Sequence, residues 1–440
     1  MKDNINKVHQ LILNGAKVST DTRQIEENSV FFALKGENFD ANRFAEQALQ
    51  KGALFAIVDD KTLPDNSKIL KVENVLETLQ ELARMHRNLF HIPVIGITGS
   101  NGKTTTKELI NAVLSCKYTA LCTEGNLNNH IGVPVTLLRL DSSHEIAIIE
   151  MGANHVGEIA FLTNMTRPGT GLITNVGKAH IEGFGSLENI VKAKTELYDF
   201  LKSSDGTILV NKSNEILMSH LDEGKCITYG SSEDCHYSGR IESAEPFLRI
   251  SFRKPKAEIS DNQWIEVRSK LLGTYNFENI MAAVAIGLHF GVDPEEIKDA
   301  IENYYPSNNR SQLKRSHINT IHMDAYNANP SSMQVALDNF SHLKTSSKKA
   351  IILGDMLELG DISFDEHRKV IERIREEDYS LVILVGPEFS RIPFDKPDHF
   401  HIFENTKQAS VWLKSQTLSG YTLLMKGSRG IQLEQLEDQL

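Results

Sequence analysis

The sequence has few cysteines and no long apolar run. Its four cysteines, Cys116, Cys122, Cys226 and Cys235, form no CxxC pair, so we expect reduced thiols in a cytoplasmic protein. No segment reaches the roughly 18 consecutive apolar residues that a membrane-spanning helix needs. The first residues, MKDNINKVHQLILNGA, lack the apolar core of a signal peptide. We therefore expect no membrane span.

Positive charge is in deficit. The chain has 47 Lys and Arg against 58 Asp and Glu, which gives a net charge of -11. This balance argues against a nucleic-acid partner or an anionic membrane surface, although it allows a local anion pocket. With 40% hydrophobic and 24% charged residues, the composition is that of a soluble globular protein. At 440 residues the chain is expected to form two or three domains.

Three blocks follow one another along the chain, and we place their boundaries at 1–88, 89–304 and 305–440. The first block mixes short strands and helices. The second begins near Pro93 and alternates apolar strands with helices, which is typical of a parallel sheet with crossover helices. Its less regular stretch, 225–270, is expected to form an antiparallel edge. After the break YYPSNNRSQ, the third block alternates in the same way.

The segment GITGSNGKTTTKE, which begins at Gly96, resembles a phosphate-binding loop but departs from the usual spacing of its glycines. A predicted strand precedes it and a helix follows. Such a loop directs backbone N–H groups and a helix N-terminus at an anion. The alternative is a glycine-rich turn with a surface lysine, but strand, glycines, lysine and threonine coincide here. We therefore expect a nucleotide-phosphate site at Gly99, Ser100, Asn101, Gly102, Lys103, Thr104 and Thr105, in which Lys103 reaches phosphate and Thr104 holds Mg²⁺.

Polar side chains also follow the next strands of this block. Glu150 ends one apolar strand and His180 follows another, at the sheet edge where open α/β sheets bind ligands. Alone, each would be read as a solvated or structural residue. Beside a phosphate loop, they become candidate Mg²⁺ ligands.

Two further groups in the second block have more than one reading. The spacing in VKAKTEL predicts that Lys192, Lys194 and Glu196 lie on a solvated helix face. The amides of TEGNLNNHIGVP indicate either a turn or a site for a polar substrate; they are Asn126, Asn128 and Asn129.

In the third block, polar residues crowd a loop between a strand and the helix that begins at Pro330. They are Asp324, Tyr326, Asn327 and Asn329. Lys426 and Arg429 follow a later strand. They are either surface charges or contacts for phosphate or carboxylate.

Taken in order, these motifs resemble those of the Mur ligases, which join amino acids to the UDP-sugar precursor of peptidoglycan. The similarity is carried by GITGSNGKTTTKE, TEGNLNNHIGVPVTLL, IEMGANHVGEI, TNVGKAHIEGFGS, DAYNANPSSM, LGDMLELG and LMKGSRG, and by VSTDTRQIEENSVFFALKGENFDANRF near the N-terminus. Members of the family have glycines at the same positions of their phosphate-binding loop. The resemblance implies an α/β fold with three domains: an N-terminal UDP-binding domain, a central P-loop ATPase domain with a mostly parallel sheet, and a C-terminal Rossmann-like domain.

The resemblance also assigns roles to residues. It implies catalytic roles for Lys103, Lys194 and His180, with Lys194 carried as a carbamate. It implies two Mg²⁺ ions held by Thr104, Glu150, His180 and Lys194. It implies nucleotide contacts at Asn276, Asn279, Arg310, Asp324 and Tyr326, and substrate contacts at Thr20, Asp21, Thr22 and Arg23 and at Asn126, Asn128 and Asn129. The chain departs from the family at Asp40-Ala41-Asn42, where an Asp-Gly-His turn is common, and at Tyr275, where His is common.

The activity implied is ATP-dependent addition of D-alanyl-D-alanine to UDP-N-acetylmuramoyl-tripeptide through an acyl phosphate, by a monomer. Two other readings compete with it. One is a sister ligase such as folylpolyglutamate synthetase, against which the UDP-type first block and YNANP argue. The other is a nucleotide-binding regulator without activity, against which intact Lys103, Thr104, Glu150 and His180 argue.

Overall fold

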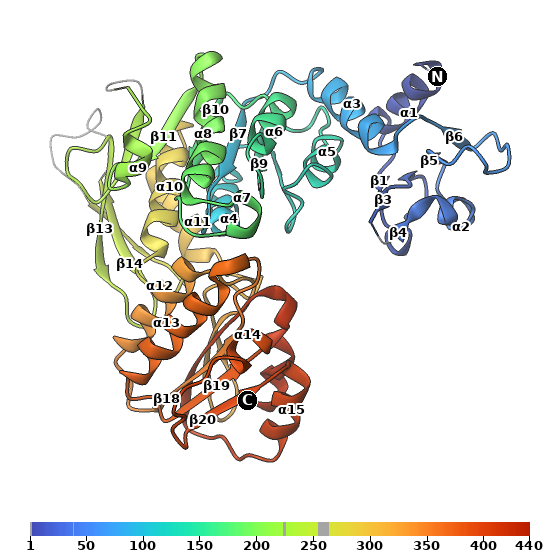
Figure 1. The fold of residues 1–440 in the computed structure, drawn as a ribbon. Helices are drawn as coiled ribbons and strands as arrows, with labels where there is room; N and C mark the ends of the chain where they lie inside the picture. Colours follow the sequence, from blue (N-terminus) through green and yellow to red (C-terminus); the bar gives the residue numbers. More distant parts are fainter. Residues whose placement is uncertain (1, 38, 223–225, 254–263) are drawn as a thin grey trace.

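The computed structural model describes residues 2–37, 39–222, 226–253 and 264–440. Within these residues, each of the three sequence blocks forms a sheet of its own (Figure 1). The predicted α/β class with largely parallel sheets is confirmed. No helix among the described residues is long and apolar enough to cross a membrane.

The first sheet is small and parallel. Its described strands run in the order β1-β2-β5-β6, and a separate hairpin, β3–β4, follows β2. The strands are β1 Val18–Ser19, β2 Val30–Phe32, β3 Lys35–Gly36, β4 Phe39–Asp40, β5 Phe55–Val58 and β6 Ile69–Lys71, and the helices are α1 Lys2–Leu13, α2 Ala45–Gln50 and α3 Val75–Arg87. The loops after β1, β2 and β5 leave the same edge of this sheet, where ligands of parallel sheets bind.

The middle sheet is the largest. Its described strands run in the order β15-β14-β13-β12-β11-β10-β7-β9-β8, parallel from β8 to β13 and antiparallel from β13 to β15. The strands are β7 Val94–Thr98, β8 Ala120–Cys122, β9 Ile146–Glu150, β10 Thr170–Ile173, β11 Thr207–Asn211, β12 Ile227–Gly230, β13 Tyr237–Ser243, β14 Arg249–Arg253 and β15 Trp264–Arg268. The antiparallel edge expected over 225–270 is therefore present; residues 225 and 254–263 lie outside the described chain.

Helices cover both faces of the middle sheet. One face packs against α4 Lys103–Leu114, α10 Asn276–His289 and α11 Pro294–Asn303, and the other against α5 Gly132–Leu137, α6 Glu158–Thr166 and α8 Leu187–Ser203. Side chains of a buried strand alternate between the faces: Ile95 and Ile97 of β7 lie in the first core, and Val94 lies in the second. Two short helices, α7 Ile181–Phe184 and α9 Glu215–Met218, complete the block.

The third sheet also has a core on each face. Its strands run in the order β16-β17-β21-β18-β19-β20, and only the β16–β17 pair of this fully described block is antiparallel. The strands are β16 Gln312–Arg315, β17 Thr320–Asp324, β18 Lys348–Gly354, β19 Leu381–Val385, β20 Phe400–Phe403 and β21 Tyr421–Lys426. The helices are α12 Pro330–Ser341, α13 Ser363–Arg375 and α14 Pro387–Ser390 on one face and α15 Thr406–Lys414 on the other.

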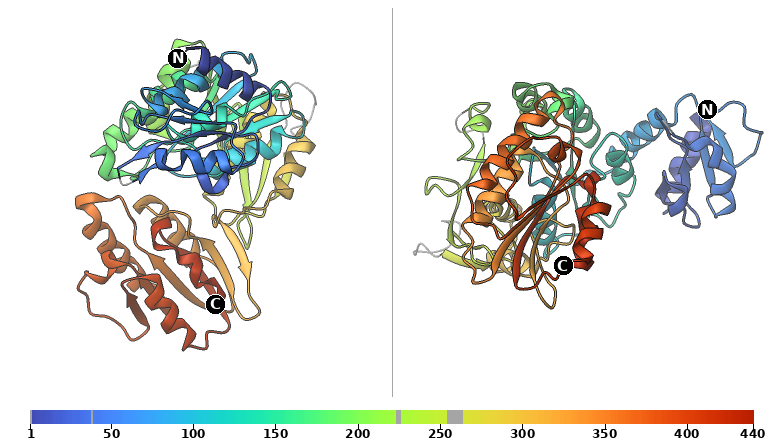
Figure 2. Two further views of the ribbon diagram at one scale, coloured as in Figure 1. Left: turned by 90° about the vertical axis from the view of Figure 1, so that its right-hand side faces the viewer. Right: turned by 60° about the horizontal axis from the view of Figure 1, so that its bottom comes forward.

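The middle block contacts both of its neighbours (Figures 1 and 2). Helix α3 packs against α5 and α6, where Arg87 Nε donates to Thr166 O at 2.8 Å. The third block lies below the middle block in Figure 1, and the first block extends to one side of it. The proposed boundaries at 88 and 304 fall directly after α3 and α11. The carboxyl ends of β7, β9 and β10 therefore open toward loops of the third block.

Candidate functional site

The loop between β7 and α4 has the conformation that its glycines permit. Gly99 and Gly102 have φ values of 145° and 80°, a region that favours glycine. A Cβ on Gly99 would lie 2.0 Å from Thr174 Oγ1, and one on Gly102 would lie 2.5 Å from Asn279 Oδ1. Ser100 N donates to Asn175 O at 2.9 Å, which ties the loop to the end of β10. This loop begins α4 and can receive phosphate at the helix N-terminus.

Lys103 is folded back onto the loop. Its Nζ donates to Gly99 O at 2.7 Å and to Ser100 O at 3.2 Å. Burial lowers the pKa of Lys103 to about 8, although the carboxylate of Glu150 opposes this shift and Arg310 adds to it. The amine is therefore surrounded by carbonyl oxygens, and an anionic phosphate would offset its desolvation.

Glu150 lies at the centre of a buried polar cluster and is only 1% exposed. Its Oε1 accepts from Asn128 Nδ2 at 2.7 Å and from Thr104 Oγ1 at 3.3 Å. Its Oε2 lies 3.8 Å from Lys107 Nζ and, among the described residues, is buried without a hydrogen-bond partner. The reading of Glu150 as a solvated strand end is excluded.

This cluster fits a Mg²⁺ ion. Mg²⁺ takes oxygen ligands, and a buried carboxylate oxygen without a donor is a candidate ligand beside the Thr104 hydroxyl. In the described part of the chain, no three His, Cys, Asp or Glu side chains converge. At most two such side chains among the described residues could therefore meet one ion, and its remaining ligands would be the Thr104 hydroxyl, substrate or water.

His180 lines the cavity directly before α7 and has a left-handed backbone (φ 55°). Its Nδ1 contacts Glu358 Oε2 of the third block. Two residues earlier, Lys178 Nζ lies 3.2 Å from Glu366 Oε1, again across the interdomain contact. The structure thus brings His180 to the cavity together with an acidic partner that sequence reasoning did not identify.

The prediction that Lys194 lies on a solvated face of α8 is wrong. Lys194 is 2% exposed, its Nζ donates to Ala153 O at 3.5 Å, and it lies 5.4 Å from the centroid of the Phe184 ring. Burial and the nearby ammonium of Lys103 lower the pKa of Lys194 to about 7. Glu196 accepts from Gly157 N at 2.6 Å at the start of α6. Only Lys192 is exposed as expected.

Lys194 lies directly behind the wall of the cavity, because its partner Ala153 belongs to the lining. The side chain is 2% exposed, so any reaction at its amine needs access past this wall.

The side chains expected near an adenine form a network at the start of α10. Asn279 Nδ2 donates to Asn276 Oδ1 at 2.8 Å, and Thr106 Oγ1 of α4 donates to Asn279 Oδ1 at 3.0 Å. Asn276 Nδ2 donates to Leu272 O at 2.7 Å. Tyr275, which replaces the usual histidine, lies 2.9 Å from Ser311 Oγ through its hydroxyl. The side-chain amides of Asn276 and Asn279 therefore already have hydrogen-bond partners within the protein. An adenine bound here would have to replace these partners or share the amides with them.

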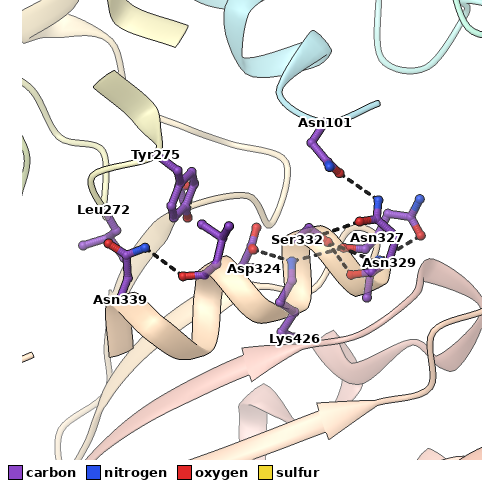
Figure 3. A network of polar contacts seen from close by, with 12 residues as sticks. Asn101, Leu272, Tyr275, Asp324, Asn327, Asn329, Ser332, Asn339 and Lys426 are labelled. Carbon is purple, nitrogen blue, oxygen red and sulfur yellow. Dashed lines mark hydrogen bonds and ion pairs between the residues drawn. The ribbon is translucent and has the colours of Figure 1, made fainter. Parts of the chain in front are cut away.

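Residues of the third block complete the cavity (Figure 3). Lys426 Nζ, at the end of β21, lies 2.6 Å from Asp324 Oδ2 at the end of β17. Asn329, which caps α12, donates from Nδ2 to Asn101 Oδ1 of the phosphate loop at 2.7 Å. The guanidinium of Arg310 lies 3.7 Å from the centroid of the Tyr326 ring. Asn327 lies in the same group, with its carbonyl accepting from Lys426 at 3.3 Å.

The cavity that these residues enclose has a volume of about 940 Å³. Its lining contains every predicted nucleotide residue from Ser100 to Thr105, together with Glu150, His180, Asn276, Asn279, Arg310, Asp324 and Tyr326. Asn126, Asn128 and Asn129 line it too, and Gln80 reaches it from α3. Lys426 belongs to the lining and is 2% exposed, so its reading as a surface charge is excluded.

The predicted residues of the first block lie elsewhere. Thr20, Asp21, Thr22 and Arg23 follow β1 and do not belong to this cavity. Asp21 Oδ2 pairs with Arg23 NH2 at 2.7 Å, and this hydrogen bond with Arg23 lowers the pKa of the Asp21 carboxyl. The site therefore consists of two separate parts, a cavity between the second and third blocks and a polar loop on the first.

Asn42, in the turn that departs from the family, is a structural residue here. It is 1% exposed, and its Nδ2 donates to Asp40 Oδ1 at 2.8 Å and to Asp59 Oδ1 at 2.9 Å. Its Oδ1 accepts from Asp59 N at 3.0 Å. The side chain thus joins the turn after β4 to the loop after β5.

Sequence reasoning missed Lys107, Lys178 and Glu358. Lys107 follows Lys103 by one helical turn, so its spacing was a usable signal. Lys178 and Glu358 had no such signal, because their roles depend on how two blocks dock.

Comparison with known families covers most of the chain. The model described as the Mur ligase family, catalytic domain matches residues 16–87. The Mur ligase middle domain matches 97–287, and the Mur ligase, glutamate ligase domain matches 309–429.

Individual relatives align with nearly the whole chain. The UDP-N-acetylmuramoyl-tripeptide–D-alanyl-D-alanine ligase of Bacillus subtilis is 34% identical over 97% of this chain and 93% of its own length. The ligase of the same name from Haemophilus influenzae is 34% identical over 95% and 92%. Among solved structures, MurF from Acinetobacter baumannii has 28% identity and a TM-score of 0.83, and MurF from Thermotoga maritima in complex with ADP has 26% and 0.81. Each of these two covers 98% of this chain and 97% of its own. The chain belongs to the Mur ligase family, in the branch that these MurF structures represent.

Proposed function

We propose that this protein is an ATP-dependent ligase that joins D-alanyl-D-alanine to UDP-N-acetylmuramoyl-tripeptide. The observation that carries the proposal is the cavity between a phosphate-binding loop and the polar loops of the third block. The relatives that bear this activity in their names align with the chain over nearly its whole length.

The chemistry follows from what an amide bond needs. A carboxylate is a poor electrophile, so its oxygen first attacks the γ-phosphorus of ATP, which forms an acyl phosphate and releases ADP. The uncharged amine of the dipeptide then attacks the acyl carbon. The C–O bond breaks, inorganic phosphate leaves with the carboxylate oxygen, and the amine loses its proton. Both steps concentrate negative charge on oxygen atoms and need a preorganised positive environment.

Lys103 would supply part of that environment. With a pKa of about 8, its amine is mostly protonated at neutral pH, and phosphate would exchange for the carbonyls of Gly99 and Ser100. Thr104 and Glu150 would hold Mg²⁺, with His180 as a further ligand and two ions in the complete site. Bound Mg²⁺ would neutralise phosphate charge during transfer.

The remaining residues would bind and orient. Asn276 and Asn279 would contact the adenine, and Arg310, Asp324 and Tyr326 the rest of the nucleotide. Thr20, Asp21, Thr22 and Arg23 would bind the UDP group, while Asn126, Asn128 and Asn129 would contact the peptide between the two sites.

Lys194 would act as a carbamate. An ammonium repels Mg²⁺, whereas the neutral amine reacts with CO₂ to give an anionic group with oxygen ligands, losing a proton. Its lowered pKa favours the neutral amine. A carbamate here would support the second Mg²⁺.

We further propose that the enzyme acts as a monomer. We also propose that the reaction takes place in the cytoplasm, where ATP is available.

Release of phosphate tests this function directly. ADP and phosphate should form only when both UDP-muramoyl-tripeptide and D-Ala-D-Ala are present, and the product mass should equal their sum less one water. Turnover with a folate and glutamate would instead indicate a folylpolyglutamate-type ligase. ATP binding without turnover on any of these substrates would indicate a regulator.

A further inference from the structure

The loop that follows β18 meets the His180 loop at two points. Glu358 Oε2 contacts His180 Nδ1, and Glu358 O accepts from Glu182 N at 3.2 Å. One residue of the third block thus holds both the side chain and the following backbone of the His180 loop.

The Glu358 loop is held firmly in its own domain. Met356 N donates to His367 Nε2 and Leu357 N donates to Ser428 Oγ, each at 2.9 Å. Asp355, which is fully buried, accepts from Glu388 N at 2.8 Å and anchors the loop to α14. Glu358 therefore approaches His180 from a supported position rather than from a free surface loop.

Both contacting residues have unusual backbones. His180 has φ 55° and Glu358 has φ 63°, in the left-handed region that non-glycine residues seldom occupy. Such a conformation costs about 1–3 kcal/mol per residue and persists where surrounding contacts enforce it. The contacts around the two loops therefore hold both residues in this conformation, in which their side chains contact each other.

The contact between His180 and Glu358 is too exposed to contribute much to the stability of domain docking. The Glu358 side chain is 55% exposed and that of His180 is 28% exposed. Ion pairs of this kind contribute roughly 0–1 kcal/mol. The pair between Lys178 and Glu366 spans the same interface with a more buried carboxylate, so domain docking alone does not explain Glu358.

A carboxylate on one imidazole nitrogen has a second effect, because it selects the tautomer. The negative charge of Glu358 against Nδ1 favours the tautomer that carries its proton on Nδ1, so Nε2 keeps its lone pair and is available as an acceptor or a metal ligand. Carboxylate–histidine pairs orient and tune metal-binding histidines in this way. His180 belongs to the lining of the cavity.

We propose that Glu358 is a positioning residue that fixes the tautomer and direction of His180 from across the domain interface, so that docking of the third domain prepares His180 for the nucleotide and its metal. The inference rests on the proposed function of the cavity. Metal binding in the second domain would then depend on Glu358 of the third domain. Glu358 can contact His180 only when the two domains are docked.

The tautomer can be observed without metal or turnover. Full-length protein labelled with ¹⁵N-histidine and saturated with ADP should show His180 with Nδ1 protonated and Nε2 unprotonated, assigned by the resonances lost in His180→Gln. Glu358→Met, which removes the acceptor at similar length, should give a mixture of tautomers. Glu358→Gln should retain the tautomer, because its amide oxygen still accepts.

Glu366→Gln is the matched control, since it weakens the neighbouring ion pair across the same interface and leaves Glu358 intact. Mn²⁺ binding to the ADP complex, measured by electron paramagnetic resonance, should weaken about 10–100-fold in Glu358→Met and remain near wild type in Glu366→Gln. Unchanged His180 resonances in Glu358→Met would overturn the inference. So would equal losses in Glu358→Met and Glu366→Gln, or loss of the tautomer in Glu358→Gln.

Product formation by the wild type, measured in parallel, separates the two claims. Ligase product together with a tautomer that does not depend on Glu358 would refute only the positioning role. A tautomer that depends on Glu358 in a protein that forms no product would refute only the proposed reaction.

Discussion

Lys194 is deeply buried, and its proposed role as a carbamate requires that the cationic amine become an anionic group. Burial, followed by repulsion from Lys103, lowers its pKa to about 7. At pH 7 about half of such amines are neutral, whereas an exposed lysine with a pKa of ~10.4 is neutral in only about 0.04% of molecules. Since CO₂ reacts with the neutral amine, the fraction of Lys194 able to react at pH 7 should be about 10³-fold larger than that of a surface lysine.

Substitution should separate this role from simple packing. Lys194→Met fills the same space without an amine, and Lys194→Arg keeps the charge but forms no carbamate ligand. Each should lose about 10–100-fold or more in turnover, the scale for disturbed support of a metal site. Lys192→Arg on the exposed face of α8 is the control and should stay near wild type.

Labelled bicarbonate gives the direct assay. With ¹³C-bicarbonate, a carbamate resonance should appear in the wild type and in Lys192→Arg but not in Lys194→Met. Exhaustive removal of CO₂ should slow the wild type, and added bicarbonate should restore it. Full activity of Lys194→Arg, or a wild type without the resonance and without dependence on bicarbonate, would refute the reasoning.

The pH dependence has a defined sign. At a fixed concentration of dissolved CO₂, carbamate and activity should rise as pH increases through about 7, because the amine loses its proton. In CO₂-free buffer the folded pKa lies below the unfolded value of ~10.4, so the unfolded chain binds more protons between pH 7 and 10. Hydrogen exchange of α8 should therefore show stability increasing with pH in that window. Lys194→Met should reduce this increase and leave the part contributed by Lys103, whose pKa is lowered to about 8.

Three further predictions concern other parts of the molecule. Lys103→Ala should reduce turnover about 10²–10³-fold while calorimetry shows normal binding of the UDP-tripeptide; loss of that binding by a folded variant would contradict the placement of the UDP site on the first domain. Asn42→Ala should destabilise the first domain by about 1–3 kcal/mol, because the buried N–H of Asp59 loses its acceptor; unchanged hydrogen exchange in β5 would argue against this. ATP should draw the third domain toward the second around 303–310, since the proposed contacts are divided between Lys103 and Arg310; identical small-angle scattering with and without ATP would indicate a rigid arrangement.

The features that local sequence determines could be predicted. Gly99, Gly102 and Lys103 follow a strand directly, and the backbone angles of the glycines are needed wherever the chain wraps around phosphate. Glu150 could be placed near them because parallel strands end at one edge of a sheet. These inferences needed no knowledge of how distant elements pack.

The burial of Lys194 was missed although α8 carried a signal for it. Ile190, Leu197 and Leu201 recur at helical spacing, and Lys194 falls on the same stripe as these fully buried residues. The charge of Lys194, considered alone, predicts a solvent-exposed side chain. Its position on the apolar stripe predicts burial instead.

The contact between His180 and Glu358 could not be read from sequence. The two residues lie in loops that follow strands of different sheets, and the surroundings of each loop depend on the docking of whole domains. The same is true of the hydrogen bond between Asn101 and Asn329. Local patterns predict each loop but not its partner across the interface.

Transfer of an oxygen isotope tests the central claim most directly. UDP-muramoyl-tripeptide labelled with ¹⁸O in its terminal carboxylate should be incubated with ATP and D-Ala-D-Ala, and the inorganic phosphate analysed by mass spectrometry. Activation through an acyl phosphate predicts one ¹⁸O atom in each phosphate released during ligation. Ligation that releases unlabelled phosphate, or that carries the label into AMP, would contradict the account.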